Sequence, residues 1–264
     1  MKFYISVDME GIAGIILPQQ LRRGESLYNE ARQLLTKEVN VIVESLVQEG
    51  ATEIIVKDAH SSGFNFLMEH LHPAATYCVG GLKTEQRFAG VDASFDGAFL
   101  IGYHGKGGVK DAIRDHTMTS KGWQYLKLNG HEIGEIGLDS LLFGLHEVPV
   151  LLVTGDDKTC AEAKETLEHV TTYQTKIGLG RHRGLLKAPQ KVYQDLEGVI
   201  KQAVENKAKV QPYTLKAPYE LLIHFISTDI ADSRYYDGKE SIRLNGLEAL
   251  YKGTDLVQLF GRAL

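Results

Sequence analysis

Short apolar runs and longer amphipathic stretches alternate along the first half of the chain. Four runs have the length and the β-branched or aromatic content of buried parallel strands: Phe3 to Val7, Glu53 to Val56, Ala98 to Gly102 and Val148 to Val153. Between the first two, apolar side chains recur every three or four positions from Ser26 to Glu49, which predicts an amphipathic helix. Gly50 follows at the position of a helix C-cap. This order predicts a right-handed strand-helix-strand unit in a parallel sheet.

A hairpin and a second helix are predicted after the third run. Asn129-Gly130 is a strong signal for a two-residue turn, and the segments 123–128 and 131–133 flank it as strands. The apolar positions from Glu135 to Leu145 fit one face of a helix, with Glu135 in its first turn. The chain is therefore expected to return to helix directly after the hairpin.

The second half of the chain is more polar. From Thr159 to Lys209 the pattern predicts helices. The tail predicts short mixed elements: a strand at Glu220 to Ile226, a short helix or loop near Ile230 to Tyr236, a strand near Ser241 to Asn245 and a helix from Leu247 to Leu259. We expect an α/β fold, with a mainly parallel sheet and flanking helices over residues 1–180 and a smaller α+β part over residues 181–264.

Composition narrows the classes of protein that this chain can represent. The 264 residues carry a formal net charge of -5 with Lys and Arg scattered, which predicts no nucleic-acid surface. No segment approaches the about 18 consecutive apolar residues of a membrane span. The apolar stretch from Met1 to Val7 is too short for a secretion signal, so we expect a cytoplasmic protein. With Cys78 and Cys160 as the only cysteines, any metal must be held by histidines and carboxylates.

Acidic and imidazole side chains follow three of the predicted strands. Asp8 and Glu10 follow the first strand and Asp58 and His60 the second. His104 follows the third. Residues i and i+2 of an extended segment point to the same side, and ligands bind beyond the carboxyl ends of parallel strands, so we expect these side chains on one rim. Mixed imidazole and carboxylate ligands favour Zn²⁺, Mn²⁺ or Co²⁺ over Ca²⁺ or Mg²⁺.

Each candidate also has a purely structural interpretation. An Asp after a strand often caps a turn or a helix, so the metal site rests on the coincidence of three strand ends, and the number of metals stays open. Asp156 and Asp157 follow the fourth run and are interpreted as helix caps. His70 and His72 are interpreted as residues of an exposed helix end, and Gly105 to Gly108 lacks a phosphate-binding string.

Six strings occur along the chain in the order seen in one enzyme family. They are YISVDMEGIAG, VKDAHS, GAFLIGYHG, DHTM, GEIGLDS and VPVLLVTGDD. In combination they resemble the D-aminopeptidases, a zinc metallopeptidase family typified by the dipeptide-transport-operon enzyme. The resemblance covers about residues 1 to 175, and the C-terminal part is similar in its order of elements.

The resemblance implies a dinuclear zinc site. Asp8 would bridge both ions, Glu10 and His60 would complete one of them, and His104 and Glu135 the other. Metals about 3.5 to 4 Å apart need such an anionic bridge, and together they polarise a peptide carbonyl and activate a shared water.

Three further assignments depend on the same strings. His116, in DHTM, matches the family's catalytic histidine and would donate a proton to the leaving amine or stabilise the tetrahedral intermediate. Glu135 is preferred over Glu132 because GEIG matches the family string. Asp58 is expected to orient the site from behind the ligands, since ligating imidazoles donate their free N–H to a carboxylate or carbonyl. The segment from Lys106 to Lys110 is this chain's own, which leaves loop geometry and substrate fit open.

The implied activity is hydrolysis of short peptides with N-terminal D-amino acids, such as D-Ala peptides, by metal-activated water. The family forms a ring of ten subunits, so a homo-oligomer is expected. Two alternatives stay open: another two-metal amidohydrolase or phosphoesterase, and a non-catalytic metal-binding scaffold subunit. The sequence does not determine the preference for D over L residues, the peptide length or the metal in the cell.

Overall fold

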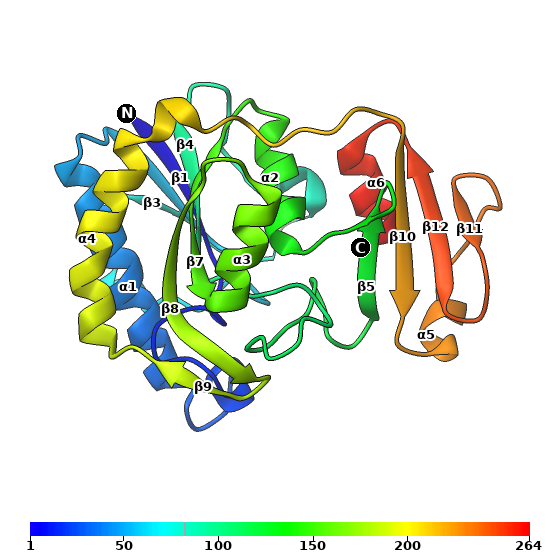
Figure 1. The fold of residues 1–264 in the computed structure, drawn as a ribbon, viewed down its shortest axis with the longest axis horizontal. Coiled ribbons are helices and arrows are strands. Elements are labelled where there is room, and N and C mark those ends of the chain that lie inside the picture. The colour runs from blue at the N-terminus through cyan, green and yellow to red at the C-terminus, as the bar shows by residue number, and fades with distance from the viewer. Residues whose placement is uncertain (82) are drawn as a thin grey trace.

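The computed structural model describes residues 1–81 and 83–264 and contains two β-sheets (Figure 1). The larger sheet has the order β3-β2-β1-β4-β7-β8-β9 and the smaller one β11-β12-β10-β5-β6. The strands of the larger sheet are β1 (Lys2–Val7), β2 (Glu53–Asp58), β3 (Thr76–Cys78), β4 (Gly97–Ile101), β7 (Val150–Asp156), β8 (Thr171–Gly180) and β9 (Arg183–Leu186). Those of the smaller sheet are β5 (Trp123–Leu128), β6 (His131–Glu132), β10 (Tyr219–Phe225), β11 (Ser241–Arg243) and β12 (Glu248–Gly253).

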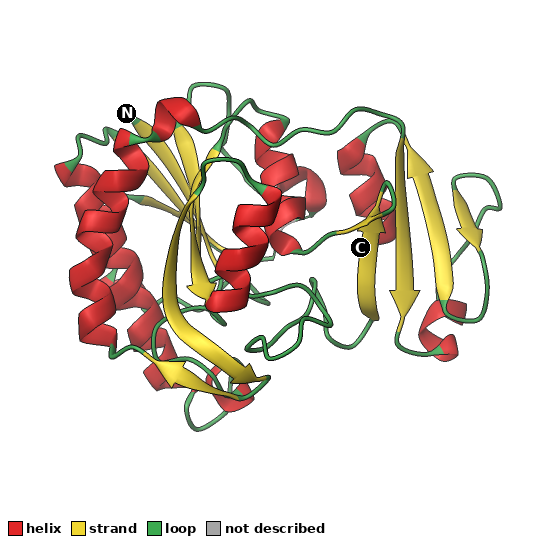
Figure 2. Ribbon diagram, viewed as in Figure 1, coloured by secondary structure: helices red, strands yellow, loops and turns green. Residues whose placement is uncertain are grey.

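Helices cover both faces of the larger sheet, as Figure 2 shows. One face carries α1 (Tyr28–Gln48) and α4 (Pro189–Glu205), and the other carries α2 (Glu135–Gly144) and α3 (Asp157–Thr166). A fifth helix, α6 (Leu256–Ala263), packs on the smaller sheet on the side toward α2, and the short α5 (Thr228–Asp232) follows β10. One apolar core lies under α1 and α4, and a second joins α2, α6 and the smaller sheet.

The larger sheet is parallel except at its last strand. β1 pairs in parallel with β2 and β4, and β7 pairs in parallel with β4 and β8, whereas β8 and β9 are antiparallel. Val7 pairs with both Asp58 and Ile101, so β1, β2 and β4 end side by side at one edge. The predicted α/β class with a mainly parallel sheet is confirmed, together with the predicted hairpin of β5 and β6.

Two secondary-structure predictions are wrong. The segment from Thr159 to Lys209 was expected to be helical, but β8 and β9 lie between α3 and α4. The β-branched residues at the start of β8 extend the parallel sheet there, and Tyr173 and Thr175 are buried. The expected helix from Leu247 to Leu259 begins as β12, because burial at Ala249 and Tyr251 follows the two-residue period of a strand.

The two sheets draw on segments that are far apart in the sequence. β5 and β6 belong to the smaller sheet although they precede β7, while β9 and α4 lie beyond residue 180 and pack with the larger sheet. The predicted division into residues 1–180 and 181–264 stays a prediction. Over the described part of the chain, no helix combines the length and apolar character of a membrane span.

Candidate metal centre

Five ionisable side chains meet at the edge where β1, β2 and β4 end. Asp8 and Glu10 follow β1, His60 follows β2, and His104 follows β4, while Glu135 begins α2. All five are buried. The loop after β1 and the loop after β4 approach each other closely at Gly11. A Cβ on Gly11 would lie 2.1 Å from the Tyr103 carbonyl oxygen, so only glycine fits there.

The first group of ligand atoms comes from Asp8, Glu10 and His60. His60 Nδ1 lies 2.9 Å from Asp8 Oδ1 and 3.1 Å from Glu10 Oε2. The other ring nitrogen, Nε2, lies 3.1 Å from the Leu21 carbonyl oxygen, which only accepts, so Nε2 carries the proton. Nδ1 is therefore the nitrogen that faces the two carboxylates and that is able to bind a metal ion.

The second group comes from Asp8, His104 and Glu135. His104 Nε2 lies 3.3 Å from Asp8 Oδ2 and 3.1 Å from Glu135 Oε1. Its Nδ1 faces the Gly105 carbonyl oxygen at 3.1 Å, which assigns the proton to Nδ1 and leaves the lone pair on Nε2. Asp8 thus turns one oxygen to each histidine.

This arrangement fits a pair of metal ions. Each histidine turns one nitrogen toward carboxylate oxygens at about hydrogen-bond distance, and a cation between them, either a proton or a metal ion, makes this arrangement favourable. Within the described residues, Glu10 Oε2 and His104 Nε2 are buried atoms with no hydrogen-bond partner. The donor set of imidazole nitrogens and carboxylate oxygens is the one that zinc takes.

The pKa values of Asp8, His60 and His104 show that the centre favours a bound positive charge. Burial works against ionisation of Asp8, but hydrogen bonds and charges from His104 and His60 hold its pKa well below the ordinary value. Burial likewise disfavours charged imidazoles, yet Glu10, Glu135 and Asp8 raise the pKa of His60 and His104 well above the ordinary value.

His116 lies over the second group rather than at the surface. Its ring stacks on that of His104 with centroids 4.0 Å apart. Its Nδ1 donates to the Arg114 carbonyl oxygen at 2.8 Å, so Nε2 is the free nitrogen, 3.8 Å from Glu135 Oε1. His116, His104 and Glu135 offer atoms within 4.8 Å of one another, so this position allows either catalysis or ligation.

Asp58 supports the centre differently from the expectation. It accepts hydrogen bonds from the His60 backbone N–H at 3.2 Å and from Asn65 N and Nδ2, while the His60 ring contacts Leu21 instead. Asn65 also donates to the His60 carbonyl oxygen. Asn65 is not among the residues predicted from the sequence, because its position five residues beyond His60 matches no motif.

Two further residues position the ligand loops. Lys176 on β8 is buried and donates to the carbonyl oxygens of Glu10, Ile12 and Ile15, at 2.7, 2.7 and 2.5 Å. Asp156 caps α3 through Thr159, as the sequence predicts, and its second oxygen accepts from Ile113 N in the loop that carries His116. A lone Lys in a strand gives no sequence signal, since only the fold brings β8 beside the β1 loop.

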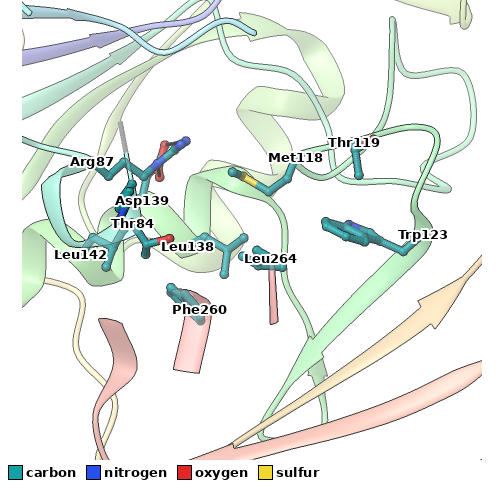
Figure 3. A pocket seen from close by; sticks show the side chains of 11 residues that line it. Thr84, Arg87, Met118, Thr119, Trp123, Leu138, Asp139, Leu142, Phe260 and Leu264 are labelled. Carbon is teal, nitrogen blue, oxygen red and sulfur yellow. Dashed lines mark hydrogen bonds and ion pairs between the residues drawn. The ribbon is translucent and has the colours of Figure 1, made fainter. Parts of the chain in front are cut away.

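The centre opens into a cavity of about 320 Å³. Its lining includes the candidate ligands Asp8, Glu10, His60 and Glu135, together with His116 and the basic residues Arg22, Arg114 and Lys121. A second cavity of about 320 Å³ shares Arg87, Met118 and Thr119 with the first. Figure 3 shows Arg87 and Asp139 at one end of it and Trp123 toward the other. Leu138, Leu142, Phe260 and Leu264 make its lining largely apolar.

Comparisons with known proteins agree on one family. The family model for D-aminopeptidases matches residues 1–261. A D-aminopeptidase of Bacillus subtilis (strain 168) is 35% identical over 214 residues, which cover 81% of this chain and 77% of that protein. A solved structure, described as a zinc-dependent D-aminopeptidase from Bacillus subtilis and a self-compartmentalizing protease, superposes with a TM-score of 0.93 at 30% identity. That match covers 100% of this chain and 95% of the other. This chain therefore belongs to the D-aminopeptidase family and is a metallo-aminopeptidase.

Proposed function

We propose that this enzyme holds two zinc ions and removes N-terminal D-amino acids from short peptides such as D-Ala-D-Ala. The observation that carries the proposal is the position of Asp8, whose two oxygens face the free nitrogens of His60 and His104. The solved relative is described as zinc-dependent, and the relatives are named for D-substrates. The donor set fits zinc.

In this proposal Asp8 bridges the two ions. Glu10 and His60 complete one site, and His104 and Glu135 complete the other. The distances within the two groups and the unpartnered atoms of Glu10 and His104 support the assignment. Once bound, two zinc ions would polarise the scissile carbonyl and activate a water for attack.

His116 is proposed to take a proton at Nε2 as the attacking water loses it, and then to donate that proton to the leaving amine. The Arg114 carbonyl oxygen and the stacked ring of His104 fix its orientation, and Nε2 is left free beside the cavity. A fixed ring costs no reorientation when the proton is transferred. The hydrogen bond from Met118 N to Glu135 Oε1 at 2.7 Å ties the loop of His116 to the start of α2.

The cavities support a substrate of few residues. A volume of about 320 Å³ is at the lower end of ligand pockets. The adjoining apolar cavity offers space for a side chain beside the reacting bond. We propose that it receives the side chain of one of the two residues flanking the cleaved bond.

We also propose that the chain assembles into a homo-oligomeric ring of ten subunits with the cavity facing an internal channel. The description of the solved relative as self-compartmentalizing supports an assembly. So does a strip of exposed apolar residues on the hairpin of β8 and β9, namely Ile177, Leu179 and Leu185. Ile177 and Leu185 are register partners, so they lie on one face. The cytoplasmic location stays a prediction.

The test compares D-Ala and L-Ala p-nitroanilides and p-nitrophenyl phosphate, before and after chelation, with zinc counted on the same sample. Chelator-sensitive cleavage favouring the D-anilide, with close to two zinc ions per chain, is the expected result. Cleavage of the phosphate ester alone would move the function to a phosphoesterase, and full occupancy without turnover would favour a scaffold. Asp8→Ala should lose both metals, whereas Glu69→Ala, an exposed carboxylate change, should keep them.

A further inference from the structure

Arg114 lies in the loop that carries His116 and lines the same cavity as the metal ligands. Its backbone adopts a left-handed conformation with φ of 57°, which is uncommon for a residue with a side chain. Its N–H donates to the Arg181 carbonyl oxygen, and its own carbonyl accepts from His116. The backbone of Arg114 is therefore fixed on both sides.

Among residues 1–81 and 83–264, the guanidinium of Arg114 has no carboxylate at ion-pair distance, although the charges of Glu10 and Asp115 act on it. It makes no ion pair with them, and its Nε is buried without a hydrogen-bond acceptor. Two neighbouring arginines differ, because Arg87 pairs with Asp139 and Arg181 pairs with Asp115. An arginine stays charged at neutral pH, and a buried donor without an acceptor is costly. Arg114 is therefore a cationic group at the cavity, near the Glu10 carboxylate but not paired with it, and it is able to bind an anion that enters the cavity.

The anion is identified by the chemistry of the substrate. A short peptide cleaved at its amino end carries one carboxylate, at its other end. A planar guanidinium binds a carboxylate through two parallel hydrogen bonds, with defined geometry. Arg22 and Lys121 also line the cavity, but both are exposed. They add positive charge, whereas Arg114 also has a buried N–H group that lacks an acceptor within the described part of the chain. A cavity of about 320 Å³ has room for a small dipeptide, whose amino end and carboxylate would then both lie near its lining.

We propose that Arg114 binds the C-terminal carboxylate of the peptide, so that the enzyme selects dipeptides and other very short peptides with a free carboxyl end. The assignment of Arg114 rests on the proposed cleavage of short peptides with N-terminal D-residues. Longer peptides place the carboxylate farther from the cleaved bond and lose this contact. Peptide amides lose it at any length.

The test compares D-Ala-D-Ala with D-Ala-D-alaninamide in the zinc-loaded wild type and Arg114→Gln. Loss of a charge-assisted bidentate contact should raise KM for D-Ala-D-Ala about 10- to 100-fold with kcat little changed. The amide should be cleaved equally well by both proteins, which also shows that the variant is folded. Arg114→Lys should raise KM for D-Ala-D-Ala less than Arg114→Gln does, because lysine keeps the positive charge but cannot form two parallel hydrogen bonds with a carboxylate. Lys110→Gln removes one charge from the same loop outside the cavity lining and should behave as wild type.

Equal losses on both peptides, or no loss on either, would overturn the proposal. A calorimetric measurement on the chelated protein separates it from the proposed function. Tighter binding of D-Ala-D-Ala than of its amide, with the difference abolished by Arg114→Gln, supports carboxylate recognition even if the loaded wild type cleaves neither peptide. Equal binding of the two peptides to the wild type overturns it. Absence of cleavage by the loaded wild type counts against the aminopeptidase function alone.

Discussion

At the scale of single residues, the centre depends on which atom of each side chain is left free. The carbonyl oxygens of Leu21 and Gly105 take one N–H from each histidine and turn the other nitrogen toward Asp8. The sequence supplies the residue types at the strand ends. The tautomers follow from backbone carbonyls that only the fold brings near.

If His116 is the proposed general acid, His116→Ala is expected to keep its bound zinc and lower kcat about 100- to 10,000-fold. Metal content and turnover measured on one sample test this. His131→Ala, an exposed histidine in the hairpin, is the control and should change neither. Loss of one zinc from His116→Ala would instead make His116 a ligand, as its distance to Glu135 allows.

Lys176→Met is expected to destabilise the protein by about 3 kcal/mol or more. The change leaves three buried carbonyl oxygens without their donor, and each such loss costs about 1 to 3 kcal/mol. Because one of these carbonyls belongs to Glu10, zinc affinity should fall too. Urea unfolding and zinc titration measure the two effects. Lys164→Met, an exposed change on α3, should leave both unaltered.

At the scale of elements, β8 is a strand that the sequence pattern does not predict. The pattern of polar and apolar residues in β8 fits a helix about as well as a strand. Pairing with β7 makes this segment a strand. By contrast, α1 was predicted to within about two residues at each end, because its apolar face is long and regular.

Asp156→Ala tests how α3 and the loop of His116 are joined. Removing the cap of α3 should cost about 1 kcal/mol, and the freed Ile113 N–H should loosen the loop, so kcat falls as well. Ser227→Ala removes the cap of α5 and should cost a similar free energy of unfolding with kcat unchanged. An unaltered kcat in Asp156→Ala would show that the loop does not need this hydrogen bond.

Glu38 on α1 should make the stability pH-dependent. Burial raises its pKa to about 7, despite the hydrogen bond from Ala13 N and the charge of Lys176 on β8. Lys176 has its own pKa lowered to about 8 by burial, and Tyr193 on α4 also faces Glu38. Between the ordinary glutamate pKa of 4.5 and about 7, the folded state keeps a proton that the unfolded chain releases.

The contribution of Glu38 is therefore complete below pH 4.5 and is lost as the pH rises through 7, with a slope of about 1.4 kcal/mol per pH unit. Unfolding free energies of wild type and Glu38→Gln at pH 5, 6 and 7 measure it, and their difference should change with this slope. Glu30→Gln, exposed on the same helix, should run parallel to wild type. A constant difference for Glu38→Gln would mean that Glu38 is ionised throughout.

At the scale of the whole molecule, the proposed assembly is testable through the exposed strip on β8 and β9. Leu185 is 61% exposed, and Leu185→Glu should place a charge where a second copy packs. Light scattering should then give a mass near the 29.3 kDa of one chain, against a large multiple for wild type. Leu244→Glu, an equally apolar exposed position near the smaller sheet, should keep the assembly. Dissociation of Leu244→Glu, with Leu185→Glu still assembled, would instead place the interface at Leu244.

The fold class and the residue types at the strand ends could be predicted from the amino-acid sequence, because apolar periodicity and strand order are local properties. The sequence also indicated which side chains should meet, since parallel strands end at one edge. The position of Asp8 between both histidines became visible only in the folded chain. The same holds for the contacts of Lys176 and Asn65 with the loops of the candidate ligands and for the place of Arg114 in the cavity lining. Those contacts join segments up to 166 residues apart, and no local pattern encodes such pairings.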